Sequence, residues 1–146
     1  AFRLEAIYLC GYTPTPPHRD IHKTALGATE TVAWHYFPTT AEAIEQLKLD
    51  GYEAWAVEQV QDSISLQDLS FNHEEKIALV FGNEAEGVQQ AVLPLCKGSI
   101  EIPQLGMKHS LNISVAVGVV LWELCRERMP SRELPGANQV PDPCEA

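Results

Sequence analysis

Short apolar runs that end at glycine or proline recur along this chain, and they constrain its fold more than any other feature. The clearest is IALVF at 77–81, which stops at Gly82 and is typical of a strand covered on both faces. The other strand-like runs occupy 5–10, 32–37, 52–58 and 99–102. Helix-like segments separate these runs, so the pattern predicts an α/β domain with a mostly parallel sheet flanked by helices.

The segments between the runs carry both helix and loop signals. Thr39 followed by Glu42 fits a capping box, which predicts a helix that Gly51 ends. The proline-rich residues 12–20 are instead predicted to form a loop. Further along, 85–96 is predicted to be helical.

The longest predicted helix ends near Arg128, and either Asn112 or Ser110 is predicted to cap its start. Its apolar stretch at 113–122 is shorter than the roughly 18 residues of a membrane span. No charged-then-apolar leader opens the sequence, so we expect a cytoplasmic protein with no membrane partner.

The size and composition predict one globular domain with a short extension. The chain has 146 residues, of which 45% are apolar. We assign the domain to residues 1–128. The remaining residues, 129–146, carry four prolines and no periodicity, so we predict a flexible tail.

Metal-ligand spacing is absent from the sequence. The four cysteines, Cys10, Cys96, Cys125 and Cys144, form no C-x-x-C pair, and we expect reduced thiols. His18 and His22 are four residues apart but lack the glutamate of H-E-x-x-H. We therefore expect no metal site.

Two loops at the ends of predicted strands carry candidate functional residues. In sheets of this class, ligands bind beyond the carboxyl ends of the strands. The first loop is GNEAEG at 82–87, and the second is PQLGMKHSLN at 103–112. Both have ordinary explanations, because acids favour a helix start and serine or asparagine commonly caps a helix.

Taken together, the two loops resemble the motifs of the SpoU/TrmH family of RNA 2′-O-ribose methyltransferases, which belong to the SPOUT class. The first loop matches G-x-E-x-x-G, and the second matches I-P-x-x-G-x-x-x-S-L-N-x-S-x-A in the same order. KTALGA at 23–28 is similar to the family more weakly. The resemblance covers most of residues 1–128.

The resemblance implies a C-terminal deep trefoil knot that binds S-adenosylmethionine, a homodimer, and no metal. By motif position, the cofactor contacts are Gly82, Ile102 and Leu111, with Val57 a less certain wall of the pocket. The positions that match catalytic support are Glu84, Ser110 and Asn112. The implied reaction is methyl transfer to a ribose 2′-hydroxyl of tRNA or rRNA.

One family motif, roughly Asn-x-Gly-x-x-x-Arg, is expected just before a segment like AFRLEAIYL, and this chain begins with that segment. Arg3 does not take the role of that arginine. The chain is then either a fragment that lacks a strand, a helix and the arginine, or a naturally reduced and inactive member.

The formal net charge of −10 is an objection to RNA binding, because nucleic-acid surfaces are usually basic. The groups that could form a local basic patch are Arg19, Lys23, Lys108, Arg126, Arg128 and Arg132. Two alternatives therefore stay open. One is a non-catalytic, RNA-associated or dimerising module of the same fold, and the other is an enzyme that methylates a base.

Overall fold

The computed structural model describes residues 2–72, 74–83, 85–107 and 110–126. The strands are β1 (Ala6–Cys10), β2 (Ala33–Phe37), β3 (Glu53–Val57), β4 (Ile64–Ser65), β5 (Ile77–Phe81) and β6 (Gly98–Glu101). The helices are α1 (Arg19–Ala25), α2 (Thr40–Leu49) and α3 (Ile113–Cys125). Short 3₁₀ turns occupy Ala28–Glu30, Leu66–Asp68 and Leu93–Leu95.

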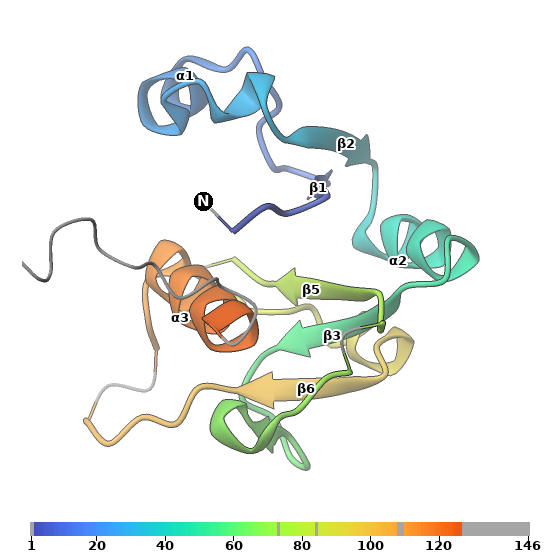
Figure 1. Cartoon of the computed structure of the whole chain (residues 1–146), viewed down its shortest axis with the longest axis vertical. Helices are drawn as coiled ribbons and strands as arrows, with labels where there is room; N and C mark the ends of the chain where they lie inside the picture. Colours follow the sequence, from blue (N-terminus) through green and yellow to red (C-terminus); the bar gives the residue numbers. More distant parts are fainter. Residues whose placement is uncertain (1, 73, 84, 108–109, 127–146) are drawn as a thin grey trace, which may run out of the picture.

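All strand pairs are parallel, which confirms the predicted sheet type, but the strands form two sheets. One sheet has the order β4-β6-β3-β5, and the other is the pair β1-β2. Figure 1 shows β1, β2 and α1 as a separate upper part, which we call the N-terminal unit and define as residues 2–37. The prediction of a single sheet is therefore wrong for the described residues.

The four-stranded sheet is covered on both faces, as the apolar β5 run predicted. Alternate residues of β3 point to opposite faces. On one face, Ala54 and Ala56 pack with Ile44 of α2. On the other, Trp55 packs with Ile100 of β6 and with Val120 of α3.

Thr39 caps the start of α2, and Glu42 bonds to the Thr39 hydroxyl and not to its backbone N–H as a full capping box would. The Glu42 backbone N–H donates to Thr39 Oγ1 at 3.2 Å, and the Thr39 hydroxyl donates to Glu42 Oε1 at 2.9 Å. At the other end, α2 stops at Leu49, before Gly51, which has a φ of +83°. The helix α1 was not predicted: it begins just after His18, whose ring accepts from the Asp20 N–H.

No helix in the described part of the chain combines the length and the apolar character that a bilayer crossing requires. Those same residues contain no group of three or more histidine, cysteine, aspartate or glutamate side chains arranged to hold a metal ion.

A hydrogen bond joins the N-terminal unit to Tyr52, the residue just before β3. The Tyr52 hydroxyl donates to Glu5 Oε2. That bond to Glu5 is the main reason that the pKa of Tyr52 rises from 10.0 to about 12. Since the folded pKa is raised, the contribution to stability is complete below pH 10 and is lost as the pH rises through about 12.

We expect Glu5→Gln to lower the pKa of Tyr52 toward 10.0, because the substitution removes the carboxylate that holds the phenolic proton. The measurement is the ultraviolet absorbance of ionised tyrosine as a function of pH. Tyr52→Phe identifies which step of the wild-type curve belongs to this residue. Superimposable curves for the wild type and Glu5→Gln would contradict the assignment.

Candidate functional site

The strand register places the ends of three strands side by side. Val57, the last residue of β3, pairs with Phe81 of β5 on one side and with Ile100 of β6 on the other. The residues that follow, Gly82, Glu58 and Ile102, therefore lie near one carboxyl edge of the sheet. Both motif loops leave this edge, as the sequence predicted.

The loop after β5 folds back on itself instead of forming a helix. Asn83 and Gly87 exchange two backbone hydrogen bonds, of 3.3 and 3.0 Å. Asn83 Oδ1 also accepts from the N–H groups of Ala85 and Glu86, at 2.9 and 2.8 Å. These N–H groups are thereby satisfied outside a helix, and Gly87 has a φ of +66°. The predicted helix at 85–96 is wrong, and only the 3₁₀ turn Leu93–Leu95 forms there.

Gly82 is required by the backbone of its own loop. A Cβ atom at this position would lie 1.8 Å from the carbonyl carbon of Gly87 and 2.2 Å from the nitrogen of Val88. A side chain at residue 82 therefore cannot fit unless the loop moves. This explains the first glycine of the motif without any ligand.

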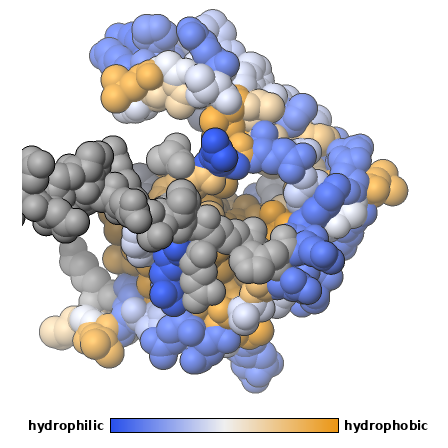
Figure 2. Space-filling model, in the orientation of Figure 1, coloured by the Kyte–Doolittle hydropathy of each residue, from blue (hydrophilic) through white to orange (hydrophobic). Residues whose placement is uncertain are grey.

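The loop after β6 begins in the core and then runs out to solvent. Ile102 is half-buried and packs against the cluster that contains Trp55 and Val120. Leu105 and Met107 are fully exposed, and Figure 2 shows apolar surface at the tip of this loop, at the lower left.

Asn112 caps α3, as predicted, in preference to Ser110. Its Oδ1 accepts from the Ser114 N–H at 2.9 Å and from the Ser114 hydroxyl at 2.7 Å. Ser110 and Leu111 precede the cap and are both exposed. The predicted end of this helix, near Arg128, lies outside the described residues, and the described helix ends at Cys125.

The structure brings some of the predicted site residues together and leaves others apart. Gly82 and Ile102 leave the same sheet edge, but they line different cavities of about 2160 and 400 Å³. Ser110, Leu111 and Asn112 line neither of these two cavities. Glu84 lies outside the described residues.

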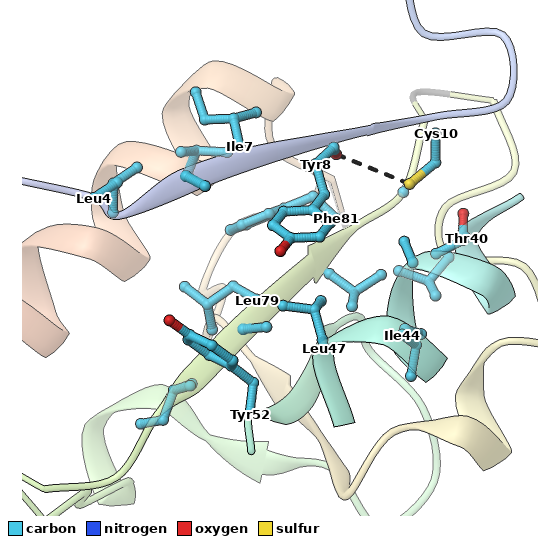
Figure 3. Close-up of a pocket in the computed structure, with 18 of the residues that line it drawn as sticks. Leu4, Ile7, Tyr8, Cys10, Thr40, Ile44, Leu47, Tyr52, Leu79 and Phe81 are labelled. Carbon is cyan, nitrogen blue, oxygen red and sulfur yellow. Dashed lines mark hydrogen bonds between the residues drawn. The ribbon is translucent and has the colours of Figure 1, made fainter. Parts of the chain in front are cut away.

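The larger cavity lies between the N-terminal unit and the rest of the molecule. Figure 3 shows Ile7 and Tyr8 of β1 on one side, with Leu79 and Phe81 of β5 on the other. Cys10 also lines it, and burial raises the pKa of this thiol, so Cys10 is protonated at neutral pH. Cys10, Cys96 and Cys125 are free, as expected.

The charges near the sheet edge are acidic. Glu58 directly follows β3, Glu101 is the last residue of β6, and both are half-buried. The basic residues Arg19 and Lys23 lie on α1, at the top of Figure 1, away from the loop after β6 at the lower left. The described structure therefore does not gather these two residues at the edge that the motif loops leave.

Glu58 is the residue of this edge that the sequence analysis missed. Its carboxylate accepts from the backbone N–H of Val88 at 2.7 Å, across thirty residues of sequence. The available signal was its position as the last residue of the third strand-like run, 52–58, just as Ile102 ends the run 99–102 and Gly82 directly follows 77–81.

Comparison with known proteins is consistent with these motifs. A family model described as the SpoU rRNA Methylase family matches residues 1–122. A tRNA (guanosine(18)-2'-O)-methyltransferase of Thermus thermophilus is 34% identical over 116 residues, 80% of this chain and 59% of that protein. A 23S rRNA (guanosine-2'-O-)-methyltransferase of Ralstonia nicotianae is 35% identical over 109 residues, 74% of this chain and 42% of that protein.

Solved structures share the fold. An AdoMet-bound rRNA methyltransferase from Sinorhizobium meliloti has a TM-score of 0.80 at 22% identity, covering 88% of this chain and 48% of that one. This chain also spans about half the length of the curated relatives above. Because the family model covers most of the sequence, this chain belongs to the SpoU rRNA methylase family.

Proposed function

We propose that this chain is the cofactor-binding domain of a cytoplasmic enzyme that methylates a ribose 2′-hydroxyl of tRNA or rRNA with S-adenosylmethionine. The observation that carries the proposal is that the loops after β5 and β6 both begin at one carboxyl edge of a parallel sheet, on either side of β3. The names of the two curated relatives support it, since both describe 2'-O-methyltransferases of RNA. The Sinorhizobium structure, which contains AdoMet, supports the choice of cofactor.

The chemistry is a direct displacement at the methyl carbon. The ribose oxygen forms a bond to that carbon while the carbon–sulfur bond breaks, and sulfur keeps the electron pair to give S-adenosylhomocysteine. The hydroxyl proton passes to a base. Catalysis of this step consists of alignment of the two reactants and removal of that proton. Gly82, Ile102 and Leu111 are proposed to hold the cofactor, with Val57 as a further wall.

Asn112, Ser110 and Glu84 are proposed to support the reaction around the loop that follows β6. The capping role of Asn112 can be tested separately from its proposed role in the reaction, because aspartate is as good an N-cap as asparagine. Asn112→Asp should keep the stability of α3 and lower kcat, since it removes the amide N–H₂ donor. Asn112→Ala should also lower the free energy of unfolding, by about 1 kcal/mol.

The measurements for these variants are urea unfolding and single-turnover methyl transfer. Ser110→Ala is expected to lower methyl transfer without changing stability, because its hydroxyl is exposed. Full activity of both Asn112→Asp and Ser110→Ala would show that these residues only shape the loop.

The experiment that tests the proposed function has three readouts. Calorimetry measures binding of S-adenosylmethionine and S-adenosylhomocysteine, tritium counting measures methyl transfer to bulk tRNA and rRNA, and mass spectrometry identifies the modified atom. Absence of cofactor binding would make the proposal wrong. Binding without transfer would favour a non-catalytic module, and a methylated base would favour the base-modifying alternative.

We also propose that a further strand, not among the described strands, pairs between β1 and β5. Among the described strands, β1 pairs only with β2, and β5 pairs only with β3. Their other edges border the cavity of about 2160 Å³, and unpaired strand edges readily accept another strand. The proposal is supported if a form extended upstream with the Asn-x-Gly-x-x-x-Arg segment unfolds at higher urea concentration and gains methyl transfer. Unchanged values of both would contradict it.

A homodimer is proposed to form through α3. Val115, Val119 and Trp122 recur at helical spacing and are exposed, with Trp122 at 55%. Sedimentation equilibrium tests this proposal, and a monomer at every concentration would contradict it.

We also propose the C-terminal trefoil knot that the resemblance implies. An experimental structure whose residues 102–126 do not pass through a loop would refute the knot.

A further inference from the structure

Glu58 links the two strands whose following loops build the candidate site. Its backbone N–H donates to the carbonyl oxygen of Ile100 in β6 at 3.0 Å. Its carboxylate Oε2 accepts from the N–H of Val88, at the end of the loop that follows β5, at 2.7 Å. Glu58, which directly follows β3, is therefore hydrogen-bonded both to β6 and to the loop that follows β5.

The loop that Glu58 contacts is compact. Asn83 and Gly87 close it with two backbone hydrogen bonds, and Asn83 Oδ1 satisfies two further N–H groups inside it. These bonds hold the loop's shape, but they do not fix the loop's position on the sheet. Val88 is 3% exposed and packs beside Val92 and Ala56, so the Glu58 bond is made where the loop returns to the core.

The second glycine of the motif lies against Glu58. A Cβ atom on Gly87 would lie 2.2 Å from Glu58 Oε2. The carboxylate thus occupies the space that a side chain at residue 87 would need. A Cβ there would displace that carboxylate, and it is the φ of +66° that requires glycine at residue 87.

We propose that Glu58 is a positioning residue that sets the distance between the loop 82–88 and the segment that begins at Ile102. The inference rests on the proposed function, because these two segments are the proposed walls of the cofactor site. Glu58 is not placed in contact with the cofactor and acts through Gly82 and Ile102.

Three substitutions separate length from charge at this position. Glu58→Gln keeps the length and an acceptor oxygen, so it should bind S-adenosylhomocysteine within about threefold of the wild type. Glu58→Asp keeps the charge but is one methylene shorter, and Glu58→Ala removes the acceptor. Both should weaken binding by about tenfold or more, since a buried N–H without its partner is costly.

The matched control is Glu53→Ala, at the opposite end of the same strand. It removes the carboxylate that pairs with Lys97 and touches neither loop. Its affinity for S-adenosylhomocysteine should equal that of the wild type. A loss as large as that of Glu58→Ala would mean that general destabilisation of β3 explains the effect.

A second readout needs no ligand: hydrogen exchange of the Val88 amide. Protection should fall in Glu58→Asp and Glu58→Ala and be retained in Glu58→Gln. If Glu58→Asp matches the wild type in both Val88 protection and affinity, the inference is overturned. If the wild type binds no cofactor while Val88 protection follows the expected order, the Glu58 contact stands, and the proposed function and the positioning role that rests on it fail.

Discussion

Gly82→Ala is expected to lower the affinity for S-adenosylmethionine by about tenfold to hundredfold. The added Cβ would lie 1.8 Å from the Gly87 carbonyl carbon and 2.1 Å from its oxygen, so the loop backbone must move. Overpacking of this kind typically costs about 1–3 kcal/mol, and each 1.4 kcal/mol is about tenfold in a binding constant. Calorimetric titration of the purified variant measures the loss.

The control for this substitution is Gly118→Ala in α3. A Cβ at Gly118 meets nothing within 4 Å, and glycine is a poor residue for a helix interior. The control should therefore gain about 0.5–1 kcal/mol of stability and keep its cofactor affinity. Wild-type affinity in Gly82→Ala would show that the loop after β5 is not a wall of the cofactor site.

Ile100→Ala is expected to lower the free energy of unfolding by about 2–5 kcal/mol. Ile100 is completely buried in β6, and its cluster joins Trp55 of β3 to Val120 of α3. Removal of its side chain leaves a cavity between the sheet and α3. Urea unfolding, followed by tryptophan fluorescence, measures the change.

Ile64 provides a matched control, because it is the register partner of Ile100 in β4 but is 40% exposed. Ile64→Ala should cost less, since less apolar surface is lost from the interior. Equal losses for the two variants would mean that β4 contributes to the core as much as β6 does.

Local sequence signals predicted the parts of the fold that local physics decides. The Thr39 cap, the β5 run and the Asn112 cap depend on residues a few positions apart, and all are present. The helix predicted at 85–96 failed because Asn83 and Gly87 give the backbone another set of hydrogen bonds. The division into two sheets depends on which strands pair across long separations, and periodicity does not encode that choice.

The candidate site could likewise be predicted only in part from the sequence. The motif loops could be placed at the carboxyl edge from strand order alone, and the structure puts Gly82 and Ile102 there. Glu58 could not be assigned, because its partner Val88 is thirty residues away and depends on the register of β3 against β5. The spacing of Ser110 and Asn112 fits a helix cap and a catalytic pair equally well, so sequence did not separate those roles.

The N-terminal unit contributes nothing to the fully buried apolar core among the described residues, whose first member is Ala43. Its Glu5 side chain bonds to Tyr52, and its strands pair with each other. We therefore expect release of this unit to require less free energy than unfolding of the four-stranded sheet. The chain should then unfold as two cooperative units, with different midpoints at Trp34 in the first and Trp55 in the second.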